Sequence, residues 1–198
     1  LIKNITLWIF EQVYAITPEF NGGNIQLSIN ISALDLEDNA LLKWVERKHR
    51  GQPQVASNVT IEVTESSTML DPDQACELLQ GFANMGFKIA IDDFGSGYSS
   101  LAYLKRFPVT ELKIDRSLVQ GIDIDTDARV ILQSTIEMGH VMGLLVTAEG
   151  VETDAEYQLI HELGADYLQG YWLSKPMPME AFKEAYLFEP YDQTTQPA

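Results

Sequence analysis

The sequence predicts an α/β fold in which six strand–helix units form most of a TIM-like (β/α)8 barrel. Two observations predict it. Strand and helix patterns alternate along the 198 residues, an order typical of a parallel sheet with helical crossovers. The strands also place apolar side chains on one face and polar ones on the other, as in a barrel whose interior holds a site.

The strands are predicted from period-two alternation and from β-branched residues. In the first, Ile25, Leu27 and Ile29 share one face, while Ser28 and Asn30 share the other. The predicted strands cover residues 25–30, 59–64, 87–92, 111–114, 144–148 and 166–168.

Apolar residues at helical spacing predict the helices. The first covers residues 5–16 and is expected to be stopped by Pro18 and Asn21-Gly22-Gly23. Asp71-Pro72 is expected to begin the helix over 72–85. The others are predicted over residues 40–49, 100–106, 127–142, 155–163 and 179–187. Residues 1–187 are therefore expected to form one domain, and residues 188–198, rich in Pro, Thr and Gln, a disordered tail.

Six units are too few for a closed barrel of this type, which usually needs about 250 residues. The chain also starts without Met and directly in a helical pattern. We therefore expect an N-terminally incomplete domain, with about two strands and their connections preceding Leu1.

The charge and composition exclude several classes of function. The formal charge is −16, from 29 acidic residues against 13 Lys and Arg, which disfavours binding to free DNA or to an anionic membrane surface. No apolar run approaches the ~20 residues of a membrane span, so no direct membrane contact is expected from this segment. A single cysteine, Cys76, rules out a disulfide framework and fits the cytoplasm, although a parent protein could be membrane-anchored.

Polar residues collect where the predicted strands end, which is where barrel enzymes hold their catalytic groups. They are Asn30, Glu62, Asp92, Asp93, Lys113, Glu149 and Gln169. Each alone would more often be a half-exposed strand end or a cap, but their recurrence at successive strand ends favours a site. The carboxylates would repel one another without cations, and oxygen ligands suit Mg²⁺ or Mn²⁺. The three histidines lie in helical segments, which disfavours a histidine metal site.

Two neighbouring features are open to more than one interpretation. The segment from Gly95 to Ser100 resembles a phosphate-binding turn but lacks the third glycine of a dinucleotide fingerprint, so we expect a mobile loop. Glu65, three residues after Glu62, could cap a helix or brace this 94–100 loop.

Several motifs in order resemble the signatures of the EAL domain family of cyclic di-GMP phosphodiesterases. They are Ser28-Ile29-Asn30-Ile31-Ser32, Glu62-Val63-Thr64-Glu65, Asp92-Asp93-Phe94-Gly95-Ser96-Gly97-Tyr98-Ser99-Ser100-Leu101, Leu112-Lys113-Ile114-Asp115-Arg116, Ala148-Glu149-Gly150-Val151-Glu152-Thr153 and Gln169-Gly170-Tyr171. The resemblance runs from about residue 2 to residue 178.

The resemblance implies a modified (β/α)8 barrel whose first strand is antiparallel. It also implies hydrolysis of cyclic di-GMP to linear pGpG with two Mg²⁺ or Mn²⁺ ions, which clamp the phosphodiester and activate a water. The implied roles are first-metal ligands for Asn30, Glu62 and Asp92; second-metal ligands for Asp92 and Asp93; general base for Glu149; water-holding for Lys113; a site-lining role for Gln169; and support for Glu65 and Glu152.

The family further suggests a homodimer that communicates through the 94–100 loop, and fusion to upstream sensor or GGDEF domains. The strand carrying the Glu-Ala-Leu motif, whose Glu is a metal ligand in the family, is absent from this chain. A non-catalytic cyclic di-GMP receptor therefore remains an alternative, although the carboxylates are retained. An enolase-like isomerase with a Lys base is disfavoured by the Asp92-Asp93 motif. The other bacterial phosphodiesterase class for this nucleotide needs a His-Asp pair, which the sequence lacks.

Overall fold

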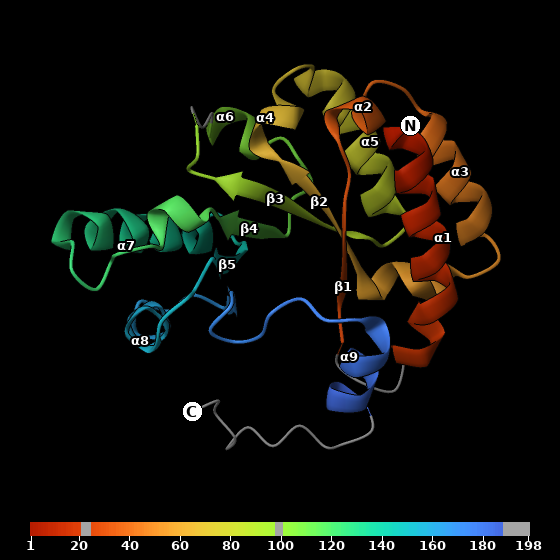
Figure 1. Ribbon diagram of the computed structural model, residues 1–198. Helices are drawn as coiled ribbons and strands as arrows, with labels where there is room; N and C mark the ends of the chain where they lie inside the picture. Colours follow the sequence, from red (N-terminus) through yellow and green to blue (C-terminus); the bar gives the residue numbers. More distant parts are fainter. Residues whose placement is uncertain (21–24, 98–100, 188–198) are drawn as a thin grey trace.

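A six-stranded parallel sheet forms the centre of the computed structural model, which describes residues 1–20, 25–97 and 101–187. The strands follow one another in chain order, and the sheet curves into part of a barrel with the helices outside it (Figure 1). They are β1 (Leu27–Asn30), β2 (Val59–Thr64), β3 (Lys88–Phe94), β4 (Glu111–Ile114), β5 (Leu145–Glu149) and β6 (Tyr167–Gln169). The predicted six-unit α/β fold is confirmed.

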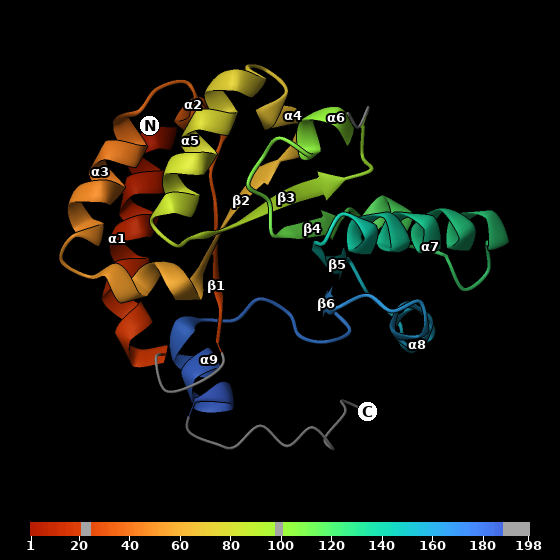
Figure 2. The same cartoon turned by 180° about the vertical axis from the view of Figure 1, so that it is seen from behind.

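The long helices other than the last cover the convex side of the sheet, the last packs on the end of the first, and the short α-helices follow strand ends. Seen from behind, α1, α3 and α5 lie on one flank and α7 and α8 on the other, with α2, α4 and α6 above them (Figure 2). The long helices are α1 (Ile2–Phe20), α3 (Ala40–His49), α5 (Pro72–Asn84), α7 (Thr126–Val141), α8 (Asp154–Glu162) and α9 (Met179–Tyr186). The short ones are α2 (Ala33–Leu36), α4 (Glu65–Thr68), α6 (Leu101–Leu104) and the 3-10 turns Pro53–Asn58 and Arg116–Leu118.

The expectation that Pro18 ends the first helix is wrong, because α1 continues to Phe20. A proline this close to a helix end removes one backbone donor from the last turns only. The extra turn is stabilised by complete burial of Phe20, whose ring meets Phe182 of α9 edge-on at 6.2 Å between centroids.

The strands over 59–64 and 111–114 and the helix over 40–49 match their predicted bounds, and the other elements apart from α1 differ by one or two residues at an end. Four of the six strands begin one or two residues later than predicted, because apolar alternation does not mark where the hydrogen-bonded pairing of strands begins. The short helices α2 and α4 and the two 3-10 turns were not predicted, since such brief segments carry little periodicity. The predicted tail over 188–198, residues 21–23 and Ser100 lie outside the described residues.

Two apolar clusters join the sheet to its helices. In the first, Phe10, Phe82 and Phe87 from α1, α5 and the start of the third strand–helix unit pack with ring centroids 5.9–6.5 Å apart. In the second, Ile136 and Ile160 of α7 and α8 pack around β4 and β5. Full burial of such side chains stabilises the fold by roughly 1.5–3 kcal/mol each.

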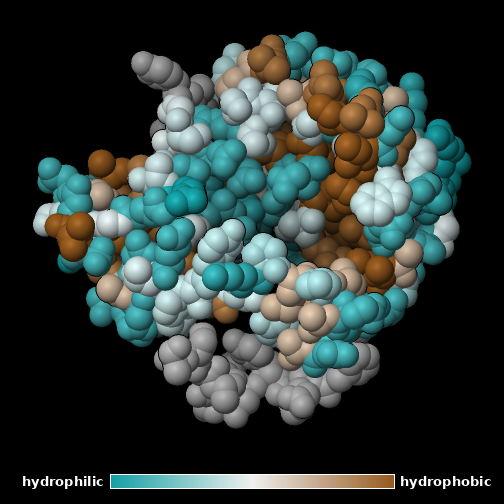
Figure 3. Space-filling view, viewed as in Figure 1, coloured by the Kyte–Doolittle hydropathy of each residue, from teal (hydrophilic) through white to brown (hydrophobic). Residues whose placement is uncertain are grey.

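The sheet has two edges within the described part of the chain, because β1 pairs only with β2 and β6 only with β5. Apolar surface gathers between β1 and α1 in the space-filling view, and α1 carries the exposed Ile2 and Ile5 (Figure 3). Within the same ranges, no helix is long and apolar enough to cross a bilayer.

The turn after β6 depends on a glycine. A Cβ on Gly170 would lie 2.1 Å from the Val151 carbonyl oxygen and 2.3 Å from its nitrogen, so the two backbones touch. This contact lets the Val151 N–H donate to Gln169 and the Trp172 N–H donate to Val151.

We predict that Gly170→Ala destabilises the protein by about 1–3 kcal/mol or more, because backbone cannot move aside as a flexible side chain can. Gly97→Ala is the matched control, since no heavy atom of the described residues lies within 4 Å of a Cβ placed there. Urea unfolding measures both, and equal stability of the two variants would contradict the prediction.

Candidate active site

The centre of the candidate site is the buried ammonium of Lys113 on β4, which is 4% exposed. Its Nζ lies 2.6 Å from Glu149 Oε1, 2.9 Å from Glu62 Oε1 and 3.7 Å from Asp92 Oδ1. Carboxylates from β5, β2 and β3 thus surround one cation at the carboxyl ends of the strands, where the sequence predicted them to meet.

Lys113 stays protonated in this setting. Burial lowers the pKa of Lys113, but the charges of Glu62 and Glu149 and their hydrogen bonds outweigh it and hold the pKa above its ordinary value.

Asp92 and Asp93 both reach this site because the end of β3 is irregular. Neighbouring residues on a regular strand point to opposite faces. The pairing of β3 with β4 shifts register between Ile91 and Phe94, and Asp93 has a φ of 56°, in the left-handed region. Asp tolerates this conformation better than most residues, and the Asp93 N–H donates to Asp92 Oδ1 at 3.0 Å.

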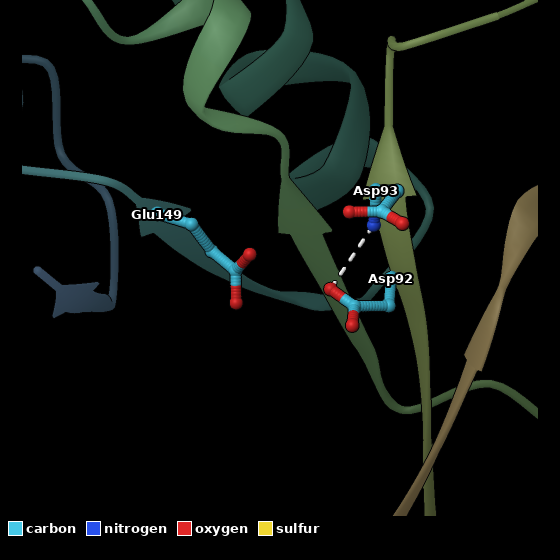
Figure 4. A group of neighbouring side chains, drawn as sticks. All are labelled: Asp92, Asp93 and Glu149. Atoms are coloured by element: carbon cyan, nitrogen blue, oxygen red, sulfur yellow. Dashed lines mark hydrogen bonds between the residues drawn. The ribbon is translucent and has the colours of Figure 1, made fainter. Parts of the chain in front are cut away.

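Asp92, Asp93 and Glu149 form a compact acidic group that faces one point (Figure 4). One carboxylate oxygen from each lies within 4.8 Å of the others. Burial raises the pKa of Asp93, and the adjacent Asp92 charge raises it further. Burial also raises the pKa of Glu149, although Lys113 acts in the opposite direction. Such a set of hard oxygen donors fits a divalent cation, which would remove the mutual repulsion.

The other expected metal ligands, Glu62 and Asn30, lie on the neighbouring strands β2 and β1. Glu62 is 5% exposed and contacts the Lys113 ammonium at 2.9 Å. Asn30 is its partner in the β1–β2 register and has an exposed side chain. The sequence therefore predicted that these residues lie at strand ends. It did not predict which of the carboxylates contact Lys113.

The three expected supporting residues divide between two places. Gln169 and Glu152 line the cleft that Asp93 and Glu149 also line. Glu65 is 9% exposed and lines a separate small pocket with Phe94 and Leu104, beneath the start of the 94–100 loop. Residues 98–100 of that loop lie outside the described residues, so the bracing role of Glu65 remains a prediction.

The cleft itself has a volume of about 750 Å³, within the range of small-molecule sites. One wall comes from the start of β1 and from α9, which packs on the end of α1, and the opposite wall comes from the ends of β5 and β6. The sequence reasoning assigned no role to Arg116, Tyr171 or Lys175, which also line it. Their position directly after strand-end motifs was the available signal.

Comparison with known proteins agrees with this geometry. The EAL domain family model matches residues 1–176, most of the chain. The chain belongs to the EAL domain family. The resemblance noted in the sequence motifs is thereby confirmed, and with it the α/β barrel class.

Curated relatives of this EAL domain are longer signalling proteins. It is 37% identical over 195 residues to the signaling protein YkoW of Bacillus subtilis, covering 96% of this chain and 24% of YkoW. It is 38% identical over 186 residues to MucR of Pseudomonas aeruginosa, named a bifunctional diguanylate cyclase/cyclic di-GMP phosphodiesterase, covering 91% of this chain and 27% of MucR. The EAL domain thus spans about a quarter of the length of these relatives.

Solved EAL structures share the fold. The MucR phosphodiesterase in complex with c-di-GMP superposes with a TM-score of 0.84 at 37% identity, covering 92% of this chain and 75% of that one. The FimX EAL domain of Pseudomonas aeruginosa bound to c-di-GMP gives a TM-score of 0.83 at 26% identity, covering 89% and 71%.

We predict that Lys113→Met destabilises the EAL domain by about 3–5 kcal/mol in EDTA, because it leaves buried carboxylates without their cation. Added Mn²⁺ should recover part of the loss by taking over the compensating charge. Lys3→Met is the matched control: it removes an exposed 2.7 Å pair with Asp38, which solvent screens, and should cost much less stability than Lys113→Met. A loss for Lys113→Met no larger than for Lys3→Met, measured by urea unfolding, would refute the prediction.

Proposed function

We propose that this EAL domain hydrolyses one phosphodiester of cyclic di-GMP to linear pGpG in a reaction that depends on Mg²⁺ or Mn²⁺. The observation that carries the proposal is the group of Asp92, Asp93 and Glu149 beside the buried Lys113 ammonium, in a cleft large enough for a dinucleotide. Relatives named as cyclic di-GMP phosphodiesterases support the substrate.

In this proposal Asp92 and Asp93 hold the metal ions, with Glu62 and Asn30 contributing from the adjoining strands. The donor set supports this assignment, since its oxygens converge and two of its carboxyl groups have raised pKa values. Bound divalent cations would polarise the phosphodiester and lower the pKa of a bound water.

The remaining roles follow from the contacts of the side chains. Lys113 orients Glu149 through their 2.6 Å contact and neutralises charge within the site. Glu149, with its raised pKa, is suited to accept a proton from an attacking water held nearby. Gln169, paired in register with Glu149, lines the cleft and can hydrogen-bond the substrate.

We extend the proposal to the setting of the domain. Residues 1–187 would act as one EAL unit of a longer cytoplasmic or membrane-anchored protein, with sensor or GGDEF domains upstream. The chain matches only 24% of the length of YkoW and 27% of the length of MucR, which supports a multidomain parent protein. Homodimerisation through the 94–100 loop is proposed from the family.

We predict linear pGpG when the protein is incubated with cyclic di-GMP and Mg²⁺ or Mn²⁺, and none in EDTA, as followed by chromatography. Glu149→Gln should lower kcat by about 10²-fold or more because the proton acceptor is removed. Glu77→Gln, an exposed change in the middle of α5, should leave kcat unaltered. Binding of cyclic di-GMP without metal-dependent product would refute the hydrolase and favour a receptor.

We also predict that Mn²⁺ raises the free energy of unfolding by about 2.7 kcal/mol at a concentration 100 times its Kd. Asp93→Asn should abolish most of this gain while retaining the side-chain size. Asp71→Asn, which alters a helix cap on α5 outside the site, is the control and should retain it. Equal gains for Asp93→Asn and Asp71→Asn would remove Asp93 from the metal site.

A further inference from the structure

The chain between β6 and α9 forms part of one cleft wall, but its backbone is held by few other elements. The residues of this connection that line the cleft are Gly170, Tyr171, Ser174, Lys175, Pro176 and Met177. The Trp172 N–H donates to the Val151 carbonyl at 3.0 Å. Within the described ranges, no backbone hydrogen bond joins residues 173–177 to another element. The conformation of the connection therefore depends largely on its side-chain contacts.

Two neighbouring side chains in this connection face different surroundings. Tyr171 is 60% exposed and lines the cleft, with the Lys175 ammonium 6.0 Å from its ring centroid. Trp172 is half-buried outside the cleft lining, where it packs with Tyr157 of α8 against the second apolar cluster. Because Tyr171 and Trp172 are adjacent in one turn, a contact that holds the Trp172 ring also limits where Tyr171 can point.

The Trp172 ring makes the closest ring contact among the described aromatic pairs. Its centroid lies 4.1 Å from that of Tyr157, with 25° between the two planes, and His161 of the same helix stacks on Tyr157 at 6.3 Å. Stacked rings stabilise each other beyond the area that they bury. Helix α8 is itself fixed at its start by the capping box of Thr153 and Glu156. Tyr157 thus gives Trp172 a fixed platform outside the cleft.

We propose that the Tyr157–Trp172 stack positions the turn after β6, so that the wall formed by Tyr171 and Lys175 is in place when substrate binds; this inference rests on the proposed function. Neither stacked ring lines the cleft, so both act through the turn and not by contact with a ligand. Without the stack the turn samples other conformations, and the apparent affinity falls in proportion to the population of the competent one. The acidic group on β3 and β5 is left in place.

The test measures steady-state hydrolysis of cyclic di-GMP with Mn²⁺ by the full chain and three variants. Tyr157→Ala removes the platform and should raise KM about tenfold while kcat changes less than about twofold, because only binding of the substrate is weakened. Tyr157→Phe retains the ring and should keep the wild-type KM. Ile160→Val is the matched control: it removes a methyl group from a fully buried position on the same helix, which lowers stability, and should also keep the wild-type KM.

Amide hydrogen exchange gives a second readout that does not depend on activity. The Trp172 N–H should exchange faster in Tyr157→Ala than in the wild type, and at the wild-type rate in Tyr157→Phe and Ile160→Val. A KM for Tyr157→Ala equal to that of Ile160→Val overturns the positioning role, as does unaltered exchange at Trp172. A folded wild type that does not hydrolyse cyclic di-GMP overturns the proposed function instead, and exchange at Trp172 still decides whether the stack holds the turn.

Discussion

The buried ammonium of Lys113 is the interaction on which the rest of the site depends. A charge removed from water costs several kcal/mol unless it is paired, and here the pairing groups come from three other strands, β2, β3 and β5. The same contacts set the spacing of the carboxylates that face the cleft. Stability and chemistry are thus coupled at one atom: moving the ammonium would disturb both the packing of the sheet and the orientation of Glu149.

The second constraint is the irregular end of β3. A regular strand would direct Asp92 and Asp93 to opposite faces, and one of them would be lost to the helical layer. The register shift and the left-handed backbone at Asp93 bring one carboxylate oxygen of each within 4.8 Å of the other and of Glu149. A conformation of this kind costs free energy, and such strain is commonly found at functional sites. In this domain the consequence is a converging pair of carboxylates instead of a single one.

The cleft beside these residues is shaped by the two ends of the described chain as well as by the strands. Helix α9 packs on the end of α1 through Phe182 and Phe20, and Lys183 pairs with Glu19 at 2.8 Å. The segment after β6 therefore crosses from one edge of the sheet to the helix beside the other edge. Asp93, Glu149, Arg116 and Glu152 all line this enclosure, so the acidic group and the exposed Arg116–Glu152 pair border the same cleft.

Sequence alone determined the order of strands and helices, the strand-end positions of Glu62, Lys113 and Glu149, and the family, because side-chain alternation and motif spacing are local properties of the chain. It did not determine that Pro18 lies within α1, since that depends on burial of Phe20 against a helix more than 150 residues away. Nor could it tell which carboxylates Lys113 would engage, or that Arg116 would meet Glu152. Those outcomes depend on the register of neighbouring strands and on backbone contacts at Gly150 and Gly170, which form only when distant segments pack together.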